Sequence, residues 1–397
     1  MNLLMKWKKE LRMRVLLVPM AAMAETSGPS GRCRLLAEGF RDAGIETATC
    51  IAKDVNYKDI EGIYNYFLDT PMPLGLPKVI ASRTFPIAQK LGITARKTVS
   101  SFDEVLWLTG NLDHRYLRVS VDSVRKAIHE FKPDVVYSEF NISAIIASKI
   151  EGIPLCASVS YPTQHEYAHR AELAKGLNRL LSEFGIQEVE SALKLFEWAD
   201  KSFCPSIVEL EPMTKPELYF CGTLKTICSA RNASVRDKII VYMGSGTVSP
   251  KKMLNIIREA FKDSRYEIYI ASASLRECED GNIHVAKRWN FDELFDEAVL
   301  FINHGGQNSM VDGLIHGVPQ LMIPGKVFER RYNAQSVSDN EAGAVIPYQE
   351  LSSSKIAAVA EQLIASDQMS ENAKRLGEKL VSAGGVNVIL QEMRKMW

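Results

Sequence analysis

The sequence contains no cysteine pattern of the kind that holds a disulfide framework or a metal. Its seven cysteines are odd in number and scattered along 397 residues. None of them has the spacing of metal ligands, and unpaired thiols of this kind are typical of cytoplasmic proteins. We therefore expect no disulfides, no metal site and a cytoplasmic location.

Net charge and long apolar runs are also missing. Lysine plus arginine equal aspartate plus glutamate at 48 each, so there is no basic field to attract nucleic acid. No apolar run approaches the ~20 residues that a helix needs to cross a bilayer. We expect neither a nucleic-acid partner nor a transmembrane segment.

The N-terminus resembles a signal peptide only in part. A basic stretch over residues 6–14 precedes a short apolar run over 15–22 and small residues that imitate a cleavage site. The same apolar run also fits the first strand of a strand-loop-helix unit, which cleavage would remove. We favour the strand, with residues 1–12 as an extension in front of it.

The sequence does contain a regular alternation of strand and helix signals. With 46% apolar residues, the chain is long enough for two α/β domains. The predicted strands lie at 15–18, 45–51, 133–138, 154–158, 202–205, 219–221, 238–243, 267–271, 284–286 and 298–302. The predicted helices lie at 34–43, 120–130, 142–151, 188–199, 250–261, 292–298, 353–365 and 371–382. This order predicts an α/β fold with parallel sheets.

The alternation is weakest in two places. Four prolines interrupt residues 64–110, which we interpret as an irregular region of helices and loops. A polar stretch at 223–236 predicts a linker between a first domain at 13–222 and a second at 237–382. An amphipathic segment at 383–397 follows the second domain.

The segment 298–334 predicts a phosphate site. A buried strand ends at His304, Gly305 and Gly306, Ser309 opens a helix, and a second strand and a polar loop follow. Glycines let the backbone approach a ligand, and the first amides of a helix, with its dipole, favour an anion. Strand-turn-helix units occur in every α/β protein, so spacing alone leaves an ordinary structural loop equally open.

In this segment the chain resembles the donor-binding signature of glycosyltransferase family 1, the UDP-glycosyltransferase type. The residues that carry the resemblance, in order, are His304, Gly305, Gly306, Asn308, Ser309, Gly317, Val318, Pro319, Pro324, Glu329, Asn333 and Ala334. The resemblance implies the GT-B fold, in which two Rossmann-like lobes with parallel sheets face each other across a cleft. It also implies that segment 383–397 is a helix that crosses back to the first lobe.

The resemblance further implies which residues bind a nucleotide-sugar donor. The side chains and amides expected at its diphosphate are Gly246, Thr247, His304, Gly306, Asn308 and Ser309. Positioned N–H and O–H groups of this kind can stabilise a departing diphosphate without a metal.

The base and the sugar of the donor would meet a second group of residues. Trp289 is the expected stacking platform for the base, although the usual Pro-Gln pair is missing nearby, so UDP and TDP both stay open. Glu329 and Asn333 are expected to contact the sugar. Arg330 stands where the family usually has glutamine, and it either selects a different sugar or turns to solvent with Arg331.

The acceptor side departs from the family. The usual general base, a histidine in the loop after the first strand, is absent. Glu25 remains in that loop, either as the base or as part of a helix cap. Glu139 takes the place of the aspartate that normally orients the histidine, and His165 with Glu166 is another pair that faces the expected cleft. An acceptor that is already nucleophilic would need little help from a base. Candidates for an apolar acceptor pocket, each of which also fits ordinary core packing, are Phe67, Leu74, Phe85, Phe102 and Trp107.

These observations favour a metal-independent, inverting glycosyltransferase that moves a sugar from a nucleotide diphosphate (UDP or TDP) to a small, partly apolar acceptor. The nucleotide sugar is a co-substrate, and we expect no cofactor. Two alternatives stay open, namely a nucleotide-sugar-binding auxiliary protein without catalysis and a nucleotide-sugar epimerase of the same fold. The acceptor and the oligomeric state are not predicted.

Overall fold

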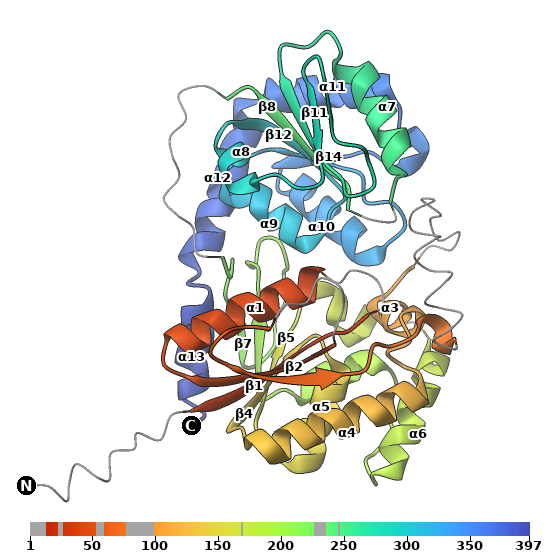
Figure 1. Ribbon diagram of the computed structural model, residues 1–397, viewed down its shortest axis with the longest axis vertical. Helices are drawn as coiled ribbons and strands as arrows, with labels where there is room; N and C mark the ends of the chain where they lie inside the picture. Colours follow the sequence, from red (N-terminus) through yellow and green to blue (C-terminus); the bar gives the residue numbers. More distant parts are fainter. Residues whose placement is uncertain are drawn as a thin grey trace, which may run out of the picture.

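The computed structural model describes residues 13–22, 27–52, 59–76, 99–167, 170–225, 236–244 and 247–397. These residues form two lobes that lie one against the other, each built around its own sheet (Figure 1). The expected N-terminal extension and most of the expected linker lie outside the described residues, as do Glu25, Phe85 and Gly246. None of the helices in the described ranges is both long enough and apolar enough to cross a membrane.

The N-terminal lobe contains a seven-stranded sheet in which every pair of neighbouring strands is parallel, in the order β3-β2-β1-β4-β5-β6-β7. The strands are β1 (Arg14–Pro19), β2 (Glu46–Ala52), β3 (Tyr64–Leu68), β4 (Val135–Glu139), β5 (Leu155–Ser158), β6 (Lys201–Cys204) and β7 (Leu218–Phe220). Val15 on β1 is in register with Thr47 on one side and Val135 on the other. The central strands are buried along their whole length except at Arg14, the half-buried first residue of β1, as expected for a sheet that is covered on both faces.

The helices of this lobe are α1 (Ser27–Asp42), α3 (Phe102–Leu108), α4 (His114–Phe131), α5 (Ile142–Glu151) and α6 (Lys175–Glu183). Side chains cap two of them, since Asp113 accepts from the first amides of α4 and Asn141 from an amide of α5. The predicted helix at 188–199 is present but shorter, as a 3₁₀-helix over Ala192–Trp198. The region 64–110 is also more regular than predicted, since it contains β3 and α3.

The C-terminal lobe contains a second seven-stranded sheet, in the order β10-β11-β9-β8-β12-β13-β14, in which only the edge pair β10 and β11 is antiparallel among the described strands. The strands are β8 (Lys238–Tyr242), β9 (Glu267–Ala271), β10 (Cys278–Asp280), β11 (Ile283–Ala286), β12 (Ala298–Asn303), β13 (Gln320–Met322) and β14 (Gly343–Val345). The helices are α7 (Pro250–Phe261), α8 (Phe291–Asp296), α9 (Gln307–Ile315), α10 (Phe328–Asp339), α11 (Ser353–Ile364), α12 (Asp367–Ser382) and α13 (Val386–Arg394). The predicted two-lobed α/β fold is confirmed.

The polar segment after β13 is not the loop that we predicted, because α10 begins there at Phe328. Neither glycine nor proline interrupts residues 326–342, and the acidic Glu329 lies in the first turn, where the helix dipole favours it. The helix turns this part of the predicted donor signature into a rigid element.

Both sheets reverse their strand order beside the first strand of the lobe. β1 lies between β2 and β4, and β8 lies between β9 and β12. Loops that leave the carboxyl ends of such neighbouring strands diverge to opposite faces of the sheet and open a crevice between them, which is where α/β proteins bind ligands. The loops after β1, β4, β8 and β12 are therefore the places to search for a site.

The chain ends by crossing back to the N-terminal lobe. Figure 1 shows α12 and α13 running along one side of the molecule, from the C-terminal lobe to the N-terminal lobe. Ile389, Leu390 and Met393 of α13 are buried in one cluster with residues of β1 and α1. Gly39 of α1 makes this approach possible, since a Cβ atom there would lie 2.8 Å from a methyl carbon of Val386.

The buried contact of α13 predicts a stability effect. Ile389→Ala removes a fully buried side chain from the N-terminal core and should lower the free energy of unfolding by about 2 to 5 kcal/mol. Asn387→Ala, at an exposed position of the same helix, should change it by less than about 0.5 kcal/mol. Urea denaturation of both variants measures the difference, and equal stabilities would contradict the proposed core contact.

Candidate functional site

His304 follows β12 and lies between two glycines. A Cβ atom on Gly244, which has a φ of +57°, would lie 3.0 Å from the imidazole ring, and one on Gly306 would lie 2.7 Å from its Nε2 atom. Larger residues at these positions would collide with the ring. The loops after β8 and β12, which flank the strand reversal, therefore meet around this histidine.

His304 is neutral in the free protein. Its Nδ1 atom lies 3.4 Å from the carbonyl oxygen of Tyr242, and because a carbonyl only accepts, that nitrogen carries the proton. Burial, followed by the positive charge of Arg330, lowers the pKa of His304 to about 3. The Nε2 atom, on the side of Gly306, is left with a lone pair and no proton to donate.

A network of amides holds the backbone of the loop that carries His304. Asn303 accepts a hydrogen bond of 2.7 Å from the Gly305 N–H and donates one of 2.8 Å to Gln320. Asn333 of α10 donates a hydrogen bond of 2.9 Å to the Gly305 carbonyl. We predicted that Asn333 contacts the sugar, but its buried side chain braces the loop.

α9 begins immediately after this loop, with Gly306 as its N-cap. It starts at Gln307, two residues before the predicted first residue, Ser309. The N–H groups of its first turn have no carbonyl one turn earlier to bond with, so they are available to an anion. Asn308 and Ser309 lie in the first turn of α9, and their contact with a diphosphate stays a prediction.

Arg330 points toward the loop after β8. Its Nη1 atom donates a hydrogen bond of 2.6 Å to the hydroxyl of Thr247, and its charge reaches His304. Arg331 points elsewhere, since it donates to the carbonyl of Val99 at 3.1 Å. The alternative in which both arginines turn to solvent is therefore wrong. Glu329, beside them, is half-buried.

Trp289 is a fixed, half-buried side chain near the carboxyl end of β9. Its indole N–H donates a hydrogen bond of 3.1 Å to the carbonyl of Ile270. The ring of Tyr269 meets it edge to face with 5.1 Å between centroids. These contacts orient the indole rigidly, which suits a stacking platform.

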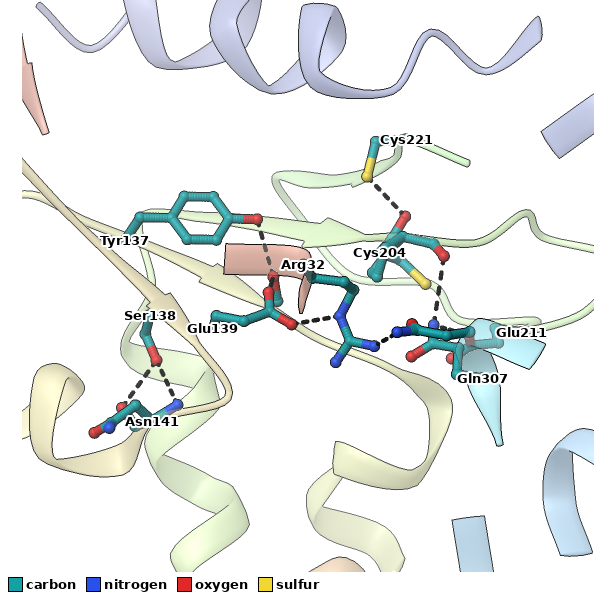
Figure 2. Close-up of polar contacts among 12 residues, drawn as sticks. Arg32, Tyr137, Ser138, Glu139, Asn141, Cys204, Glu211, Cys221 and Gln307 are labelled. Atoms are coloured by element: carbon teal, nitrogen blue, oxygen red, sulfur yellow. Dashed lines mark hydrogen bonds and ion pairs between the residues drawn. The ribbon is translucent and has the colours of Figure 1, made fainter. Parts of the chain in front are cut away.

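Glu139 ends β4 and is completely buried. One of its oxygens accepts a hydrogen bond of 2.5 Å from Nε of Arg32, and the other accepts from the hydroxyl of Ser158 (Figure 2). Both oxygens of this carboxylate are thus engaged, one of them by a guanidinium. Glu139 therefore orients Arg32 of α1.

The turn after β4 is locked onto β1. Phe140 has a φ of +58°, which is uncommon for a bulky residue. Asn141 holds this turn in place. Its side-chain amide donates a hydrogen bond of 2.8 Å to the carbonyl of Pro19. The hydroxyl of Ser138 donates to the backbone carbonyl of Asn141 and accepts from its backbone N–H (Figure 2). This fixes the carboxyl ends of β1 and β4, the expected acceptor side, although Glu25 in the loop between β1 and α1 lies outside the described residues.

Two polar side chains of the N-terminal lobe reach the first turn of α9. Arg32 donates a hydrogen bond of 3.0 Å to the side-chain oxygen of Asn308, and Glu211 accepts one of 3.4 Å from the side-chain amide of Gln307 (Figure 2). Glu211 also accepts a hydrogen bond of 2.6 Å from the N–H of Tyr161. The N-terminal lobe therefore holds the helix end that forms the anion site.

Aromatic rings extend this junction. Tyr161 stacks on Tyr332 of α10 with 4.5 Å between centroids, and Tyr167 packs against Phe328 at 5.7 Å. The predicted pair His165 and Glu166 lies in the short helix between these tyrosines, where His165 is half-buried and Glu166 is exposed. Of the predicted acceptor-pocket residues in the described ranges, Phe102 is a core residue, whereas the exposed ones are Phe67, Leu74 and Trp107.

Sequence reasoning missed Arg32, Glu211 and Gln307. Glu211 lies in a proline-containing stretch that resembles a linker, and nothing in its neighbours indicates that it is buried. Gln307 stands inside the predicted signature, but its side chain donates a hydrogen bond to Glu211 of the N-terminal lobe. No group of three or more potential metal-ligating His, Cys, Asp or Glu side chains occurs within the ranges that the structure describes.

Comparisons with known proteins agree with this geometry. Residues 268–396 match the family model "Erythromycin biosynthesis protein CIII-like, C-terminal domain". The NDP-glycosyltransferase YjiC of Bacillus subtilis (strain 168) is 22% identical over 155 residues, which cover 38% of this chain and 39% of that protein. The aligned region thus spans about two fifths of that relative.

Solved glycosyltransferases share the whole fold. The glycosyltransferase of kitacinnamycin superposes with a TM-score of 0.75 at 16% identity, covering 97% of this chain and 99% of that one. Spinosyn rhamnosyltransferase SpnG, in complexes with thymidine diphosphate and with spinosyn aglycone, gives TM-scores of 0.70 and 0.69 at 14% identity, covering 96% of this chain and 100% of that one. The fold is GT-B, and the predicted resemblance to family 1 glycosyltransferases is confirmed.

The Arg32–Glu139 pair predicts a large effect of removing one partner. Arg32→Met leaves a buried carboxylate without its cation and should cost about 3 to 5 kcal/mol of unfolding free energy at pH 7.5. Arg34→Met is the control, since Arg34 forms an ion pair of 3.6 Å with Glu38 that is more than a third exposed. Equal costs of the two substitutions in urea denaturation would contradict the role of Arg32.

The lobe junction predicts a pH effect. Burial raises the pKa of Glu211 to about 7, so its protonated form is favoured in the fold and its contribution to stability is lost as the pH rises through 7. Glu211→Gln imitates the protonated form and should stabilise the protein by up to about 3 kcal/mol at pH 8.5, with no gain below about pH 5.

Glu209 provides a control of opposite sign. Its ion pair with Lys379 lowers the pKa of Glu209, so Glu209→Gln should lose a little stability at pH 8.5, by about 1 kcal/mol at most. Thermal unfolding between pH 5 and 8.5 compares the variants. A Glu211→Gln protein that is no more stable than the wild type at pH 8.5 would show that Glu211 is ionised without cost.

Proposed function

We propose that the protein is a metal-independent, inverting glycosyltransferase that moves a sugar from a nucleotide diphosphate to a small, partly apolar acceptor. The observation that carries this proposal is the anion site at the strand reversal of the C-terminal lobe. There, glycines let His304 lie close to the backbone of the loops after β8 and β12, and the hydroxyl of Thr247 and the first amides of α9 belong to the same two loops and to the helix that follows them.

Sugar transfer places new negative charge at that point. The bond between the sugar C1 and the diphosphate oxygen breaks, and its electron pair stays on the diphosphate. The acceptor atom attacks C1 from the opposite side and loses its proton. Fixed N–H groups, a hydroxyl and the positive end of a helix stabilise the growing charge without reorganising, which is how much of enzymatic rate acceleration arises.

The nucleotide base would stack on Trp289, the rigid aromatic side chain near the end of β9. UDP and TDP both remain candidate nucleotides. The solved complex of spinosyn rhamnosyltransferase SpnG with thymidine diphosphate supports TDP, whereas stacking on an indole suits either pyrimidine.

The acceptor would bind at the strand reversal of the N-terminal lobe, beside the ends of β1 and β4. Since both oxygens of Glu139 are engaged, we assign it the role of a positioning residue for Arg32. Glu25 stays our proposed proton acceptor. The solved complex of SpnG with spinosyn aglycone supports a small-molecule acceptor.

A nucleotide-sugar-binding protein without transferase activity is the second candidate. It is favoured by one observation, which is that the buried carboxylate at the end of β4 is paired with an arginine and not with a histidine. This candidate should bind a nucleotide sugar without turnover, whereas a transferase should also transfer the sugar when an acceptor is present.

The donor site predicts ligand-dependent stabilisation. A matching UDP- or TDP-sugar at about 100 times its Kd should raise the unfolding temperature by about 3 °C. His304→Ala should reduce this shift by more than half, because it removes a wall of the diphosphate site. His316→Ala, at the other end of α9, should keep it.

A panel of nucleotide sugars in a thermal-shift assay, followed by product analysis with small acceptors, decides between the candidates. Stabilisation together with sugar release or transfer supports the transferase. Stabilisation without turnover for any acceptor supports the binding protein. A wild-type protein that no nucleotide or nucleotide sugar stabilises would refute the donor site itself.

A further inference from the structure

Arg330 has an unexpected place. It belongs to the first turn of α10, and its guanidinium donates 2.6 Å to the hydroxyl of Thr247 in the loop after β8. The backbone of Arg330 packs closely against Gly305 in the loop after β12. A Cβ atom on Gly305 would lie 2.6 Å from the backbone oxygen of Arg330. Arg330 is therefore fixed between the two loops that form the anion site.

The histidine of the anion site does not supply a positive charge. His304 is buried, its proton lies on the nitrogen beside the Tyr242 carbonyl, and its Nε2 atom only accepts. A diphosphate consists of acceptors, so a neutral ring in this tautomer has nothing to donate to it at Nε2. The site needs another donor with a lasting charge.

We propose that Arg330 is the cation that stabilises the leaving diphosphate, in place of reading the sugar. This rests on the proposed function, because it assigns a role within the same donor site. The geometry supports it in three ways, namely the bond to Thr247, the closeness to His304 and the rigid position in the first turn of α10.

The chemistry of arginine suits this role better than that of glutamine, which the family usually has there. A guanidinium stays charged, and its planar array of N–H groups matches two phosphate oxygens at once. Because the Thr247 oxygen accepts from Arg330, its own proton is free to point to the ligand. Arg330 and Thr247 would then act together on the same phosphate group.

Other arginines near the junction are committed to different partners. Arg331, the next residue, donates to the carbonyl of Val99 in the N-terminal lobe. Arg32 holds Glu139 and Asn308. The charge of Arg330 also explains why His304 stays neutral, since burial and this charge both lower the pKa of the histidine.

The test compares nucleotides that differ only in their phosphates. Isothermal titration of the full-length protein with nucleoside diphosphate, nucleoside monophosphate and nucleoside, for uridine and thymidine, measures each group separately. Arg330→Gln, which installs the usual family residue, should weaken diphosphate binding about 10- to 100-fold, weaken monophosphate binding less and leave nucleoside binding unchanged. Arg331→Gln is the matched control and should leave diphosphate affinity within about twofold.

A second variant keeps the test decisive. Arg330→Lys keeps the charge and should bind diphosphate within about tenfold of wild type.

The possible outcomes separate this inference from the proposed function. If wild type binds diphosphate and Arg330→Gln binds it equally well while changing its preference among nucleotide sugars, Arg330 reads the sugar and the inference is overturned. Equal losses in Arg330→Lys and Arg330→Gln would also overturn it, since charge would then not matter. A wild-type protein that binds no nucleotide refutes the proposed function instead.

Discussion

The candidate site depends on one topological constraint, the reversal of strand order beside β8. Because β9 and β12 lie on opposite sides of β8, the loops after β8 and β12 must separate at the carboxyl edge of the sheet and leave room between them. Glycines at 244, 305 and 306 then let a histidine and two helix ends enter that room. The strand order and the three glycines together thus allow polar groups to gather at the carboxyl edge of an apolar sheet.

The sequence was most informative where a local rule decides the structure. Continuous apolar runs predicted the buried parallel strands, and the spacing around His304 predicted a loop that faces a helix end, as the structure has it. α5, α7 and β9 have the predicted bounds because clear caps and breaks flank them. α10 was not predicted because its apolar and polar residues separate only weakly onto two faces. In the structure it packs against the loop after β12, where Asn333 donates a hydrogen bond to the Gly305 carbonyl.

The directions of individual side chains could not be predicted from the sequence. Asn333 and Gln307 belong to the donor signature, yet one braces a backbone carbonyl and the other faces the opposite lobe. Arg32 and Glu139 are separated by more than a hundred residues, so only the assembled sheet brings them within bonding distance. Such pairings depend on how elements far apart in the sequence pack together, and the periodicity of one element carries no information about that.

The return of α13 to the first lobe has a consequence for how the protein is made. Ile389, Leu390 and Met393 complete a core whose other members come from β1 and α1, at the opposite end of the chain. During synthesis, the first lobe therefore leaves the ribosome with an unfinished apolar surface, which stays open until α13 has emerged. Emergence of α13, and not completion of the first sheet, would then be the event that protects the nascent first lobe against aggregation.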